Sequence, residues 1–266
     1  MREPADHSGK VFIVGAGPGA EDLITLRGLR ALQQADIVLY DALVSSTTLD
    51  HLPPWAERVY VGKRCGKHSL KQEQINHLII SKSREGKTVV RLKGGDPLIF
   101  GRGGEEALAC SEAGIDFEIV PGVSAALGAA SYAGIPLTHR GVSSSVAFVT
   151  AHGAQRGDSP DLTWVGLAGS VDTLVIFMGA AWLGEIVAAL LKFGLPGTRP
   201  VAAVSNATFQ TQATVLATLE TIEAEVQRAG LQAPILIIVG EVARLNEKLN
   251  WFERQTEAAL LCATSS

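Results

Sequence analysis

The stretch Thr88–Glu106, TVVRLKGGDPLIFGRGGEE, decides the fold of this chain. It begins with Thr88–Leu92, an apolar run rich in β-branched residues and too short for a helix, which predicts a strand. Five glycines follow within residues 94–104, before a helical pattern starts. Glycine allows positive φ and lets a ligand approach the main chain closely. A βα turn alone would explain a pair of glycines, but this run favours a ligand-binding loop.

The composition is that of a globular protein, with 47% hydrophobic and 19% charged residues in a chain of 266. This length suits one large or two medium domains. The net charge of -4 gives no support to binding of nucleic acid or of an acidic membrane. The polar N-terminus lacks the apolar core of a signal peptide, and no apolar run is long enough to span a membrane. Three scattered cysteines offer neither a disulfide framework nor metal-ligand spacing, so we expect a cytoplasmic protein without a metal site.

Short apolar runs alternate with helical patterns on both sides of the opening stretch. The further runs that we expect to be strands are Val11–Val14, Ile37–Tyr40, Arg58–Val61 and Phe117–Val120. Helical spacing of apolar residues separates several of them. Strands that alternate with helices predict a largely parallel sheet with helices on both faces, joined by right-handed crossovers.

A second α/β pattern follows residues 134–141, GIPLTHRG, where a proline and two glycines suggest a domain boundary. Its predicted strands are residues 146–150, 174–177, 201–205, 211–218 and 235–239, and its predicted helices are 181–193, 219–229 and 246–260. Repeated threonines in 208–218 suggest a strand pair, so we expect this second sheet to be mixed. We therefore predict an α/β fold of two consecutive domains, residues 10–135 and 141–245, with tails 1–9 and 246–266.

Gly15–Gly19, GAGPG, follows the first predicted strand and resembles a dinucleotide-binding turn at first sight. The GxGxxG pattern needs its third glycine where Ala20 stands. Pro18 also removes a main-chain N–H that a pyrophosphate would use. These departures disfavour a nicotinamide-dependent oxidoreductase.

Polar residues and glycines recur at the carboxyl ends of the predicted strands, where open parallel sheets bind ligands. They are Gly15–Gly19, Asp41, Lys63, Gly94–Asp96 and Gly122–Ala125. Asp41 and Lys63 could transfer protons if both face a cleft, although alone Asp41 would cap a turn and Lys63 would be a solvated charge. Asp96 could bind a ligand or cap the turn before Pro97.

Three arginines lie in loops rich in glycine or proline, namely Arg64, Arg102 and Arg140. A guanidinium in such a loop can bind a carboxylate through two hydrogen bonds, or it can form a surface ion pair. His139 and His152 have no partner at metal-ligand spacing, and we expect both to be structural.

Four segments together, GAGPG, VVRLKGGDPLIFGRGGEE, PGVSAA and GIPLTHRG, resemble the uroporphyrinogen-III C-methyltransferases of the tetrapyrrole (class III) methyltransferase family. The similarity covers residues 10–245. GAGPG and GGDP are shared by the wider family, whereas RLKGGDPLIFGRGGEE and GIPLTHR are specific to the uroporphyrinogen enzymes. The chain looks like the stand-alone form, without the dehydrogenase/ferrochelatase domain of siroheme synthases.

The resemblance implies a homodimer that binds S-adenosylmethionine in a cleft between two α/β domains. It implies two methylations of uroporphyrinogen III, to precorrin-1 and then precorrin-2, with S-adenosylhomocysteine as by-product. The sequence leaves open whether the route leads to siroheme, cobalamin or another tetrapyrrole. The cofactor contacts of the family correspond here to Pro18, Gly94, Gly95, Asp96, Ile99, Ser124, Ala125, Met178 and Ala207. Its proposed proton acceptor corresponds to Asp41 and its proposed donor to Lys63.

The many carboxylates of that substrate would give Arg64, Arg102 and Arg140 a partner. One departure from the family is Thr150-Ala151-His152, where relatives have glycine in the middle position. Ser124 stands where relatives often have threonine, which keeps the hydroxyl. A related precorrin methyltransferase and a non-catalytic cofactor-binding module remain as alternatives.

Overall fold

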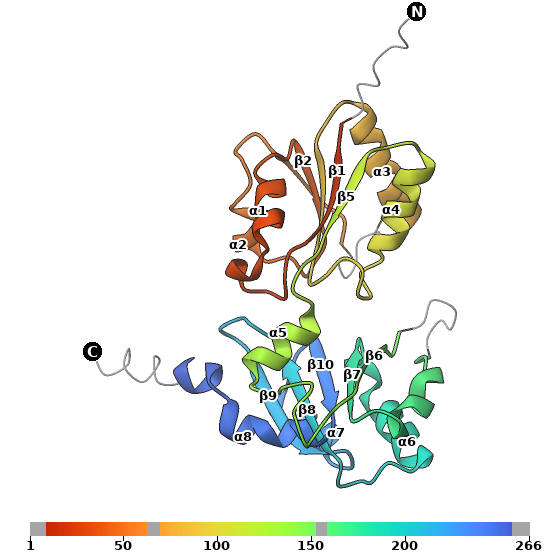
Figure 1. Ribbon diagram of the computed structural model, residues 1–266, viewed down its shortest axis with the longest axis vertical. Helices are drawn as coiled ribbons and strands as arrows, with labels where there is room; N and C mark the ends of the chain where they lie inside the picture. The colour runs from red at the N-terminus through yellow and green to blue at the C-terminus, as the bar shows by residue number, and fades with distance from the viewer. Residues whose placement is uncertain (1–8, 63–69, 153–158, 257–266) are drawn as a thin grey trace, which may run out of the picture. The chain divides into compact units, whose positions relative to one another are not determined.

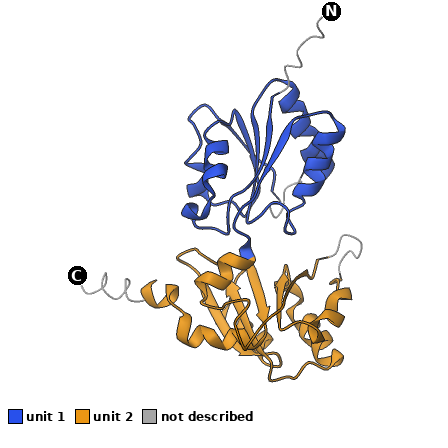
Figure 2. Cartoon of the chain, viewed as in Figure 1, with its two compact units in different colours: residues 1–125 blue, residues 126–266 orange. Residues whose placement is uncertain are grey.

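The computed structural model describes residues 9–62, 70–152 and 159–256, and it divides into two compact units, Met1–Ala125 and Ala126–Ser266 (Figure 2). Each unit contains one five-stranded sheet. The predicted α/β class with two consecutive sets of strands and helices is confirmed.

The first unit contains a fully parallel sheet with the strand order β3-β2-β4-β1-β5. Its strands are β1 (Val11–Gly15), β2 (Ile37–Tyr40), β3 (Glu57–Tyr60), β4 (Val89–Lys93) and β5 (Phe117–Val120). Its helices are the short η1 (Glu21–Leu23), α1 (Leu26–Leu32), α2 (Ser46–Leu49), α3 (Gln72–Arg84) and α4 (Gly103–Glu112). The parallel sheet predicted from the alternating pattern is therefore confirmed.

Helices cover both faces of this sheet (Figure 1). α1 and α2 pack against Val90 and Leu92 on one face. α3 and α4 pack against Val89 and its neighbours on the other face. Because side chains alternate along a strand, Arg91 and Lys93 of β4 point to the same face as Val89. Two charged side chains are thus buried beneath α3 and α4.

The second unit contains a mixed sheet with the strand order β6-β7-β10-β8-β9. Its strands are β6 (Val146–Thr150), β7 (Thr173–Phe177), β8 (Pro200–Ser205), β9 (Ala213–Thr218) and β10 (Ile235–Val239). Its helices are α5 (Ala125–Tyr132), η2 (Thr163–Gly169), η3 (Ala180–Trp182), α6 (Leu183–Phe193), α7 (Ile222–Ala229), η4 (Glu241–Leu245) and α8 (Asn246–Leu249). The predicted mixed sheet is confirmed. The range 208–218, where a strand pair was expected, contains the single strand β9, which pairs antiparallel with β8.

Three strands of the second sheet run in one direction. β7 and β8 are both antiparallel to β10, so they point the same way, and β6 is parallel to β7. The carboxyl ends of β6, β7 and β8 therefore lie at one edge of this sheet, although the sheet as a whole is mixed.

The observed division of the chain differs from the expected boundary at residues 134–141. α5 belongs with the second unit, because Ala126 and Ala129 are buried against β7, β8 and β10. The expected tail from residue 246 is also part of this unit, since the buried Asn246 donates a hydrogen bond from Nδ2 to the carbonyl oxygen of Ala133 at 2.6 Å. A helix made of small residues gives no strong periodic signal, which explains why its unit was not predicted.

In the part of the chain that the structure describes, no helix combines the length and the apolar character needed to cross a membrane.

Candidate active site

Three glycine-rich loops of the first unit meet main chain to main chain at the carboxyl ends of β1, β4 and β5. A Cβ on Gly15 would lie 2.6 Å from the carbonyl oxygen of Gly95, and a Cβ on Gly122 would lie 2.3 Å from the same oxygen. Gly95 has φ +68°, and its N–H donates to the carbonyl oxygen of Gly17 at 2.6 Å. Only glycine fits such close approach. The segments GAGPG, GGDP and PGVSAA thus contact one another at the carboxyl-terminal edge of the first sheet, where a ligand site was predicted.

Asp96 holds two of these loops together. Its Oδ1 accepts the N–H of Leu98 at 2.9 Å, and its Oδ2 accepts the N–H of Gly122 at 3.1 Å. The carboxylate therefore caps its own turn and also ties the loop after β4 to the loop after β5. Each oxygen keeps a second lone pair, so these bonds leave acceptor capacity for a ligand.

The neighbouring predicted contacts lie on the same edge. Gly94 directly follows β4, and a Cβ there would lie 2.6 Å from Cβ of Leu43 in the loop after β2. Ser124 is buried and Pro18 is partly buried, whereas Ile99 is exposed. Ala125, partly buried, is the first residue of α5.

Asp41 follows the last residue of β2 and is oriented from two sides. Its Oδ1 accepts the N–H of Leu43 at 3.2 Å, and its Oδ2 lies 3.4 Å from Nη2 of Arg91. The Asp41 side chain is 26% exposed, whereas that of Arg91 is 4% exposed. A buried guanidinium therefore holds a carboxylate that remains accessible at the edge of the sheet.

Arg91 belongs to a buried charge network that was not predicted from the sequence. Its Nε and the Nζ of Lys93 donate to Oε1 of Glu106 at 2.9 and 3.1 Å, and Gln72 Nε2 donates to the same oxygen at 3.1 Å. Glu106 is fully buried, and its Oε2 has no hydrogen-bond partner. Burial lowers the pKa of Lys93, helped by repulsion from Arg91 and opposed by Glu106. A signal did exist: two charges on one face of a central parallel strand need a buried partner.

Arg102 pairs with the carboxylate of Glu105 one turn along α4. Its Nε and Nη2 donate to the two carboxylate oxygens at 2.8 and 2.7 Å, and both side chains are more than half exposed. The hydrogen bond to Glu105 raises the pKa of Arg102 and lowers the pKa of Glu105. Arg102 is thus a surface ion pair in this structure, at the end of the loop where it was predicted to meet a substrate carboxylate.

Unusual backbone conformations occur in loops at the strand ends of each unit. Among the described residues, five that are not glycine have positive φ, namely Phe100, Arg102, Met178, Asn206 and Thr208. The first two lie in the loop after β4, and the others follow the carboxyl ends of β7 and β8. Strained residues of this kind concentrate at ligand-binding sites.

In the second unit, Met178 and Ala207 lie on one edge of the sheet, because they follow β7 and β8. Met178 is 48% exposed, and Ala207 is partly buried between the strained Asn206 and Thr208. Ala151 follows β6 at this same edge, is fully buried, and is not one of the residues with positive φ. Alanine in place of glycine is therefore compatible with the backbone here.

Arg140 is not brought together with Met178 and Ala207. It is exposed in a turn closed by His139 and Ser143, and Oγ of Ser143 lies 2.9 Å from Oγ1 of Thr173, the first residue of β7. Arg140 thus lies toward the opposite edge of the second sheet. Lys63 and Arg64 fall outside the described residues.

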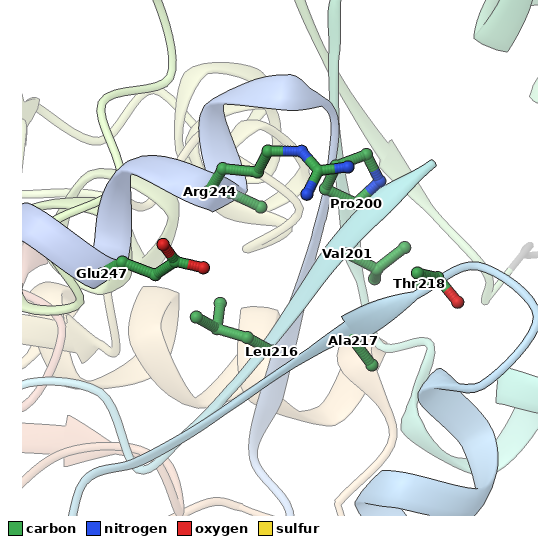
Figure 3. Close-up of a pocket in the computed structure, with 8 residues that line it drawn as sticks. Pro200, Val201, Leu216, Ala217, Thr218, Arg244 and Glu247 are labelled. Carbon is green, nitrogen blue, oxygen red and sulfur yellow. The ribbon is translucent and has the colours of Figure 1, made fainter. Parts of the chain in front are cut away.

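The second unit also has a shallow pocket of about 200 Å³ between β8, β9 and the η4–α8 segment (Figure 3). Its lining consists of Pro200, Val201, Leu216, Ala217, Thr218, Ala243, Arg244 and Glu247. None of these residues was predicted to bind a ligand, and Pro200 begins β8, at the edge opposite to Ala207. Within the described ranges, no group of three or more His, Cys, Asp or Glu residues could hold a metal ion.

Comparison with known proteins agrees with this geometry. Residues 10–223 match the sequence profile of the tetrapyrrole (corrin/porphyrin) methylases. A siroheme synthase of Thiobacillus denitrificans is 49% identical over 262 residues, which are 98% of this chain and 54% of the relative. The chain thus spans about half the length of the curated relatives it matches.

Two solved structures match the chain over most of their own length. A uroporphyrin-III C-methyltransferase from Thermus thermophilus, complexed with S-adenosylhomocysteine, has a TM-score of 0.78 and 41% identity over 89% of this chain and 100% of its own. A cobalt precorrin-4 methyltransferase has a TM-score of 0.78 and 30% identity over 91% and 99%. With its two α/β units and glycine-rich strand ends, this chain belongs to the tetrapyrrole (corrin/porphyrin) methylase family.

Proposed function

We propose that this chain transfers two methyl groups from S-adenosylmethionine to uroporphyrinogen III, giving precorrin-2 by way of precorrin-1. The observation that carries the proposal is the 41% identity to the Thermus thermophilus uroporphyrin-III C-methyltransferase over the whole of that chain. The product would serve siroheme or cobalamin synthesis, in agreement with the siroheme synthases among the relatives.

The glycine-rich edge of the first unit suits an adenosyl ligand. Where Gly15, Gly95 and Gly122 meet, the loops pack main chain to main chain, so no bulky side chain of these residues stands at the edge where a ligand would bind. The residues that we propose to hold S-adenosylmethionine in this unit are Pro18, Gly94, Gly95, Asp96, Ile99, Ser124 and Ala125. Met178 and Ala207 are the proposed contacts from the second unit.

S-adenosylmethionine would supply an electrophilic methyl group on a positively charged sulfur. A pyrrole carbon of the substrate forms the new bond as the methyl–sulfur bond breaks, so the protein contributes mainly by positioning. A proton must then leave the ring system, and one base is sufficient for this step. Asp41 is the proposed acceptor, because Arg91 and the N–H of Leu43 fix a carboxylate that is still 26% exposed. Lys63 is the proposed proton donor.

Arginines would bind the carboxylates of the substrate. Arg102 is the best placed of the three predicted residues, because it ends the loop that follows β4, close in sequence to Asp96. Its fork of donors now binds Glu105 and could bind a substrate carboxylate in the same two-bonded manner. Arg64 stays a proposal, and Arg140 would serve only a more distant carboxylate.

The chain is further proposed to act as a homodimer in the cytoplasm.

The deciding experiment is anaerobic incubation of the purified protein with methyl-labelled S-adenosylmethionine and uroporphyrinogen III, followed by the mass of the product. A gain of two labelled methyl groups is expected. A tetrapyrrole that stays unlabelled while the cofactor binds would rule out this substrate but not the family.

A related precorrin methyltransferase is the second candidate, because the cobalt precorrin-4 enzyme has the same TM-score of 0.78. Its identity of 30%, against 41% for the uroporphyrin enzyme, places it second. Later precorrins are the substrates to try if uroporphyrinogen III is not methylated.

A further inference from the structure

The loop after β8 has a backbone that must be held in place by its surroundings. Asn206 has φ +46° and Thr208 has φ +71°, on either side of the proposed cofactor contact Ala207. Residues with a side chain cost free energy in this region of φ and persist only when other contacts enforce the conformation. The contacts that enforce it are therefore part of the site.

Gln212 supplies the first of these contacts. Its side-chain Oε1 accepts the main-chain N–H of Thr208 at 2.9 Å. Both residues are buried, with 8% of Gln212 and 4% of Thr208 exposed. A side-chain amide can be turned by half a rotation, which would place its NH₂ group against that N–H and break the bond. Something must select the orientation that accepts.

Glu253 makes that selection. Its Oε1 accepts Nε2 of Gln212 at 3.3 Å and Oγ1 of Thr214 at 2.6 Å, and its Oε2 accepts Nδ2 of Asn250 at 3.1 Å. An ionised carboxylate only accepts hydrogen bonds, so it can face only the NH₂ end of Gln212. The other end of the amide is then directed to Thr208.

The segment that carries Glu253 is anchored on the second unit. The indole Nε1 of Trp251 donates to the carbonyl oxygen of Ser131 at 2.9 Å. The ring of Tyr132 lies 5.2 Å from that of Trp251 and 4.8 Å from that of Phe252, measured between centroids. Residues that the sequence analysis assigned to a tail are thus fastened to α5.

We propose that Glu253, acting through Gln212, is a positioning residue that holds the loop 206–208 in its cofactor-binding conformation. This inference rests on the proposed function, because it takes the adenosyl cofactor to be the ligand of that loop. Thr208 donates to Gln212, and Gln212 donates to Glu253. Because the negatively charged carboxylate of Glu253 can only accept, it fixes the direction of both hydrogen bonds.

The test is the affinity for S-adenosylhomocysteine, measured by titration calorimetry on the full chain. Glu253→Gln can face Gln212 with either end of its amide and no longer selects one orientation, so we expect an affinity lower by about tenfold. Hydrogen exchange at the Thr208 amide should accelerate in the same variant. Glu247→Gln, an exposed position on α8, is the matched control and should bind normally.

An exchange of the two residues separates positioning from a general loss of stability. Gln212→Glu alone places two carboxylates side by side and should weaken binding. In the double variant Gln212→Glu with Glu253→Gln, the carboxylate at position 212 still accepts the N–H of Thr208. The amide at position 253 donates to that carboxylate, so most of the affinity for S-adenosylhomocysteine should return.

Normal binding by Glu253→Gln, or failure of the double variant to recover although it folds as the single variants do, would overturn the proposal. The proposed function is tested separately. If the unaltered chain binds no S-adenosylhomocysteine, the proposed function is wrong. If it binds S-adenosylhomocysteine but does not methylate uroporphyrinogen III, only the assignment of the substrate is wrong.

Discussion

A Cβ atom added to Gly122 would lie only 2.3 Å from the carbonyl oxygen of Gly95. Gly122→Ala must therefore separate the loops after β4 and β5. We expect a loss of about 1–3 kcal/mol in the free energy of unfolding and weaker binding of S-adenosylhomocysteine. Gly104→Ala has no neighbouring atom within 4 Å and should leave both quantities unchanged or raise stability slightly. If thermal unfolding and calorimetry give the two variants the same stability and the same affinity for S-adenosylhomocysteine, the close packing at Gly122 is contradicted.

Asp41 can be tested without disturbing the cofactor loops. Asp41→Asn keeps the shape of the side chain but removes the proposed proton acceptor, so kcat should fall by about 10²–10⁴-fold while the affinity for S-adenosylhomocysteine stays the same. Asp50→Asn, at the exposed end of α2, serves as the control. Activity within a few-fold of the unaltered chain would remove Asp41 from the reaction.

Glu118 makes the stability of the first unit sensitive to acid. Hydrogen bonds from Arg27 and Lys10 lower the pKa of Glu118 to about 2, below the ordinary value of 4.5. Since the folded pKa is the lower one, this stabilisation is present above pH 4.5 and is lost as the pH falls toward 2. Glu118→Gln should therefore show a shallower loss of stability than the unaltered chain over that range.

The measurement is urea unfolding at several pH values between 2 and 7, with Glu112→Gln on the exposed side of α4 as the control. A slope for Glu118→Gln that equals the slope of the control would contradict the assignment.

At the scale of elements, β4 and α4 are joined by the buried charges. Glu106→Gln leaves Lys93 buried without its contacting carboxylate and leaves Arg91 with only the partly exposed Asp41, so we expect a loss of about 3–5 kcal/mol in the free energy of unfolding. Glu105→Gln removes only an exposed pair with Arg102 and should cost less than about 1 kcal/mol. Urea titration of the two neighbouring variants compares them directly, and similar losses would show that the buried network contributes little.

Most strands could be predicted, because β-branched apolar runs between glycines carry a strong local signal. Four strands were predicted to the residue, namely Ile37–Tyr40, Phe117–Val120, Val146–Thr150 and Ile235–Val239, and the others differ by one or two residues at their ends. The single turn α2 and the 3₁₀ segment η2 were missed, since elements this short have no visible period.

The part of the candidate site that consists of glycine-rich loops at strand ends could be predicted from the sequence. Gly94–Asp96 and Gly122 lie on the edge where a parallel sheet was expected to bind a ligand. The link between Gln212 and Glu253 could not be predicted, because it joins residues 41 positions apart through tertiary packing. The role of Arg140 depended on topology, which placed it toward the other edge.

At the scale of the whole molecule, we predict a homodimer. Sedimentation equilibrium should give about twice the monomer mass of 28.0 kDa. S-adenosylhomocysteine at about 100 times its Kd should raise the free energy of unfolding by about 2.7 kcal/mol. Homocysteine alone should leave the free energy of unfolding unchanged. A mass of 28.0 kDa at micromolar concentration would contradict the dimer.

The position of β10 has a consequence for how the chain can be divided. Of the strands in the described residues, β10 is the last in sequence, yet it pairs with both β7 and β8 at the centre of its sheet. The family profile ends at residue 223, before that strand begins. A ribosome must therefore synthesise the chain through Val239 before the second sheet can close. A fragment trimmed to the profile would leave two separate strand pairs, with their inner edges open to aggregation.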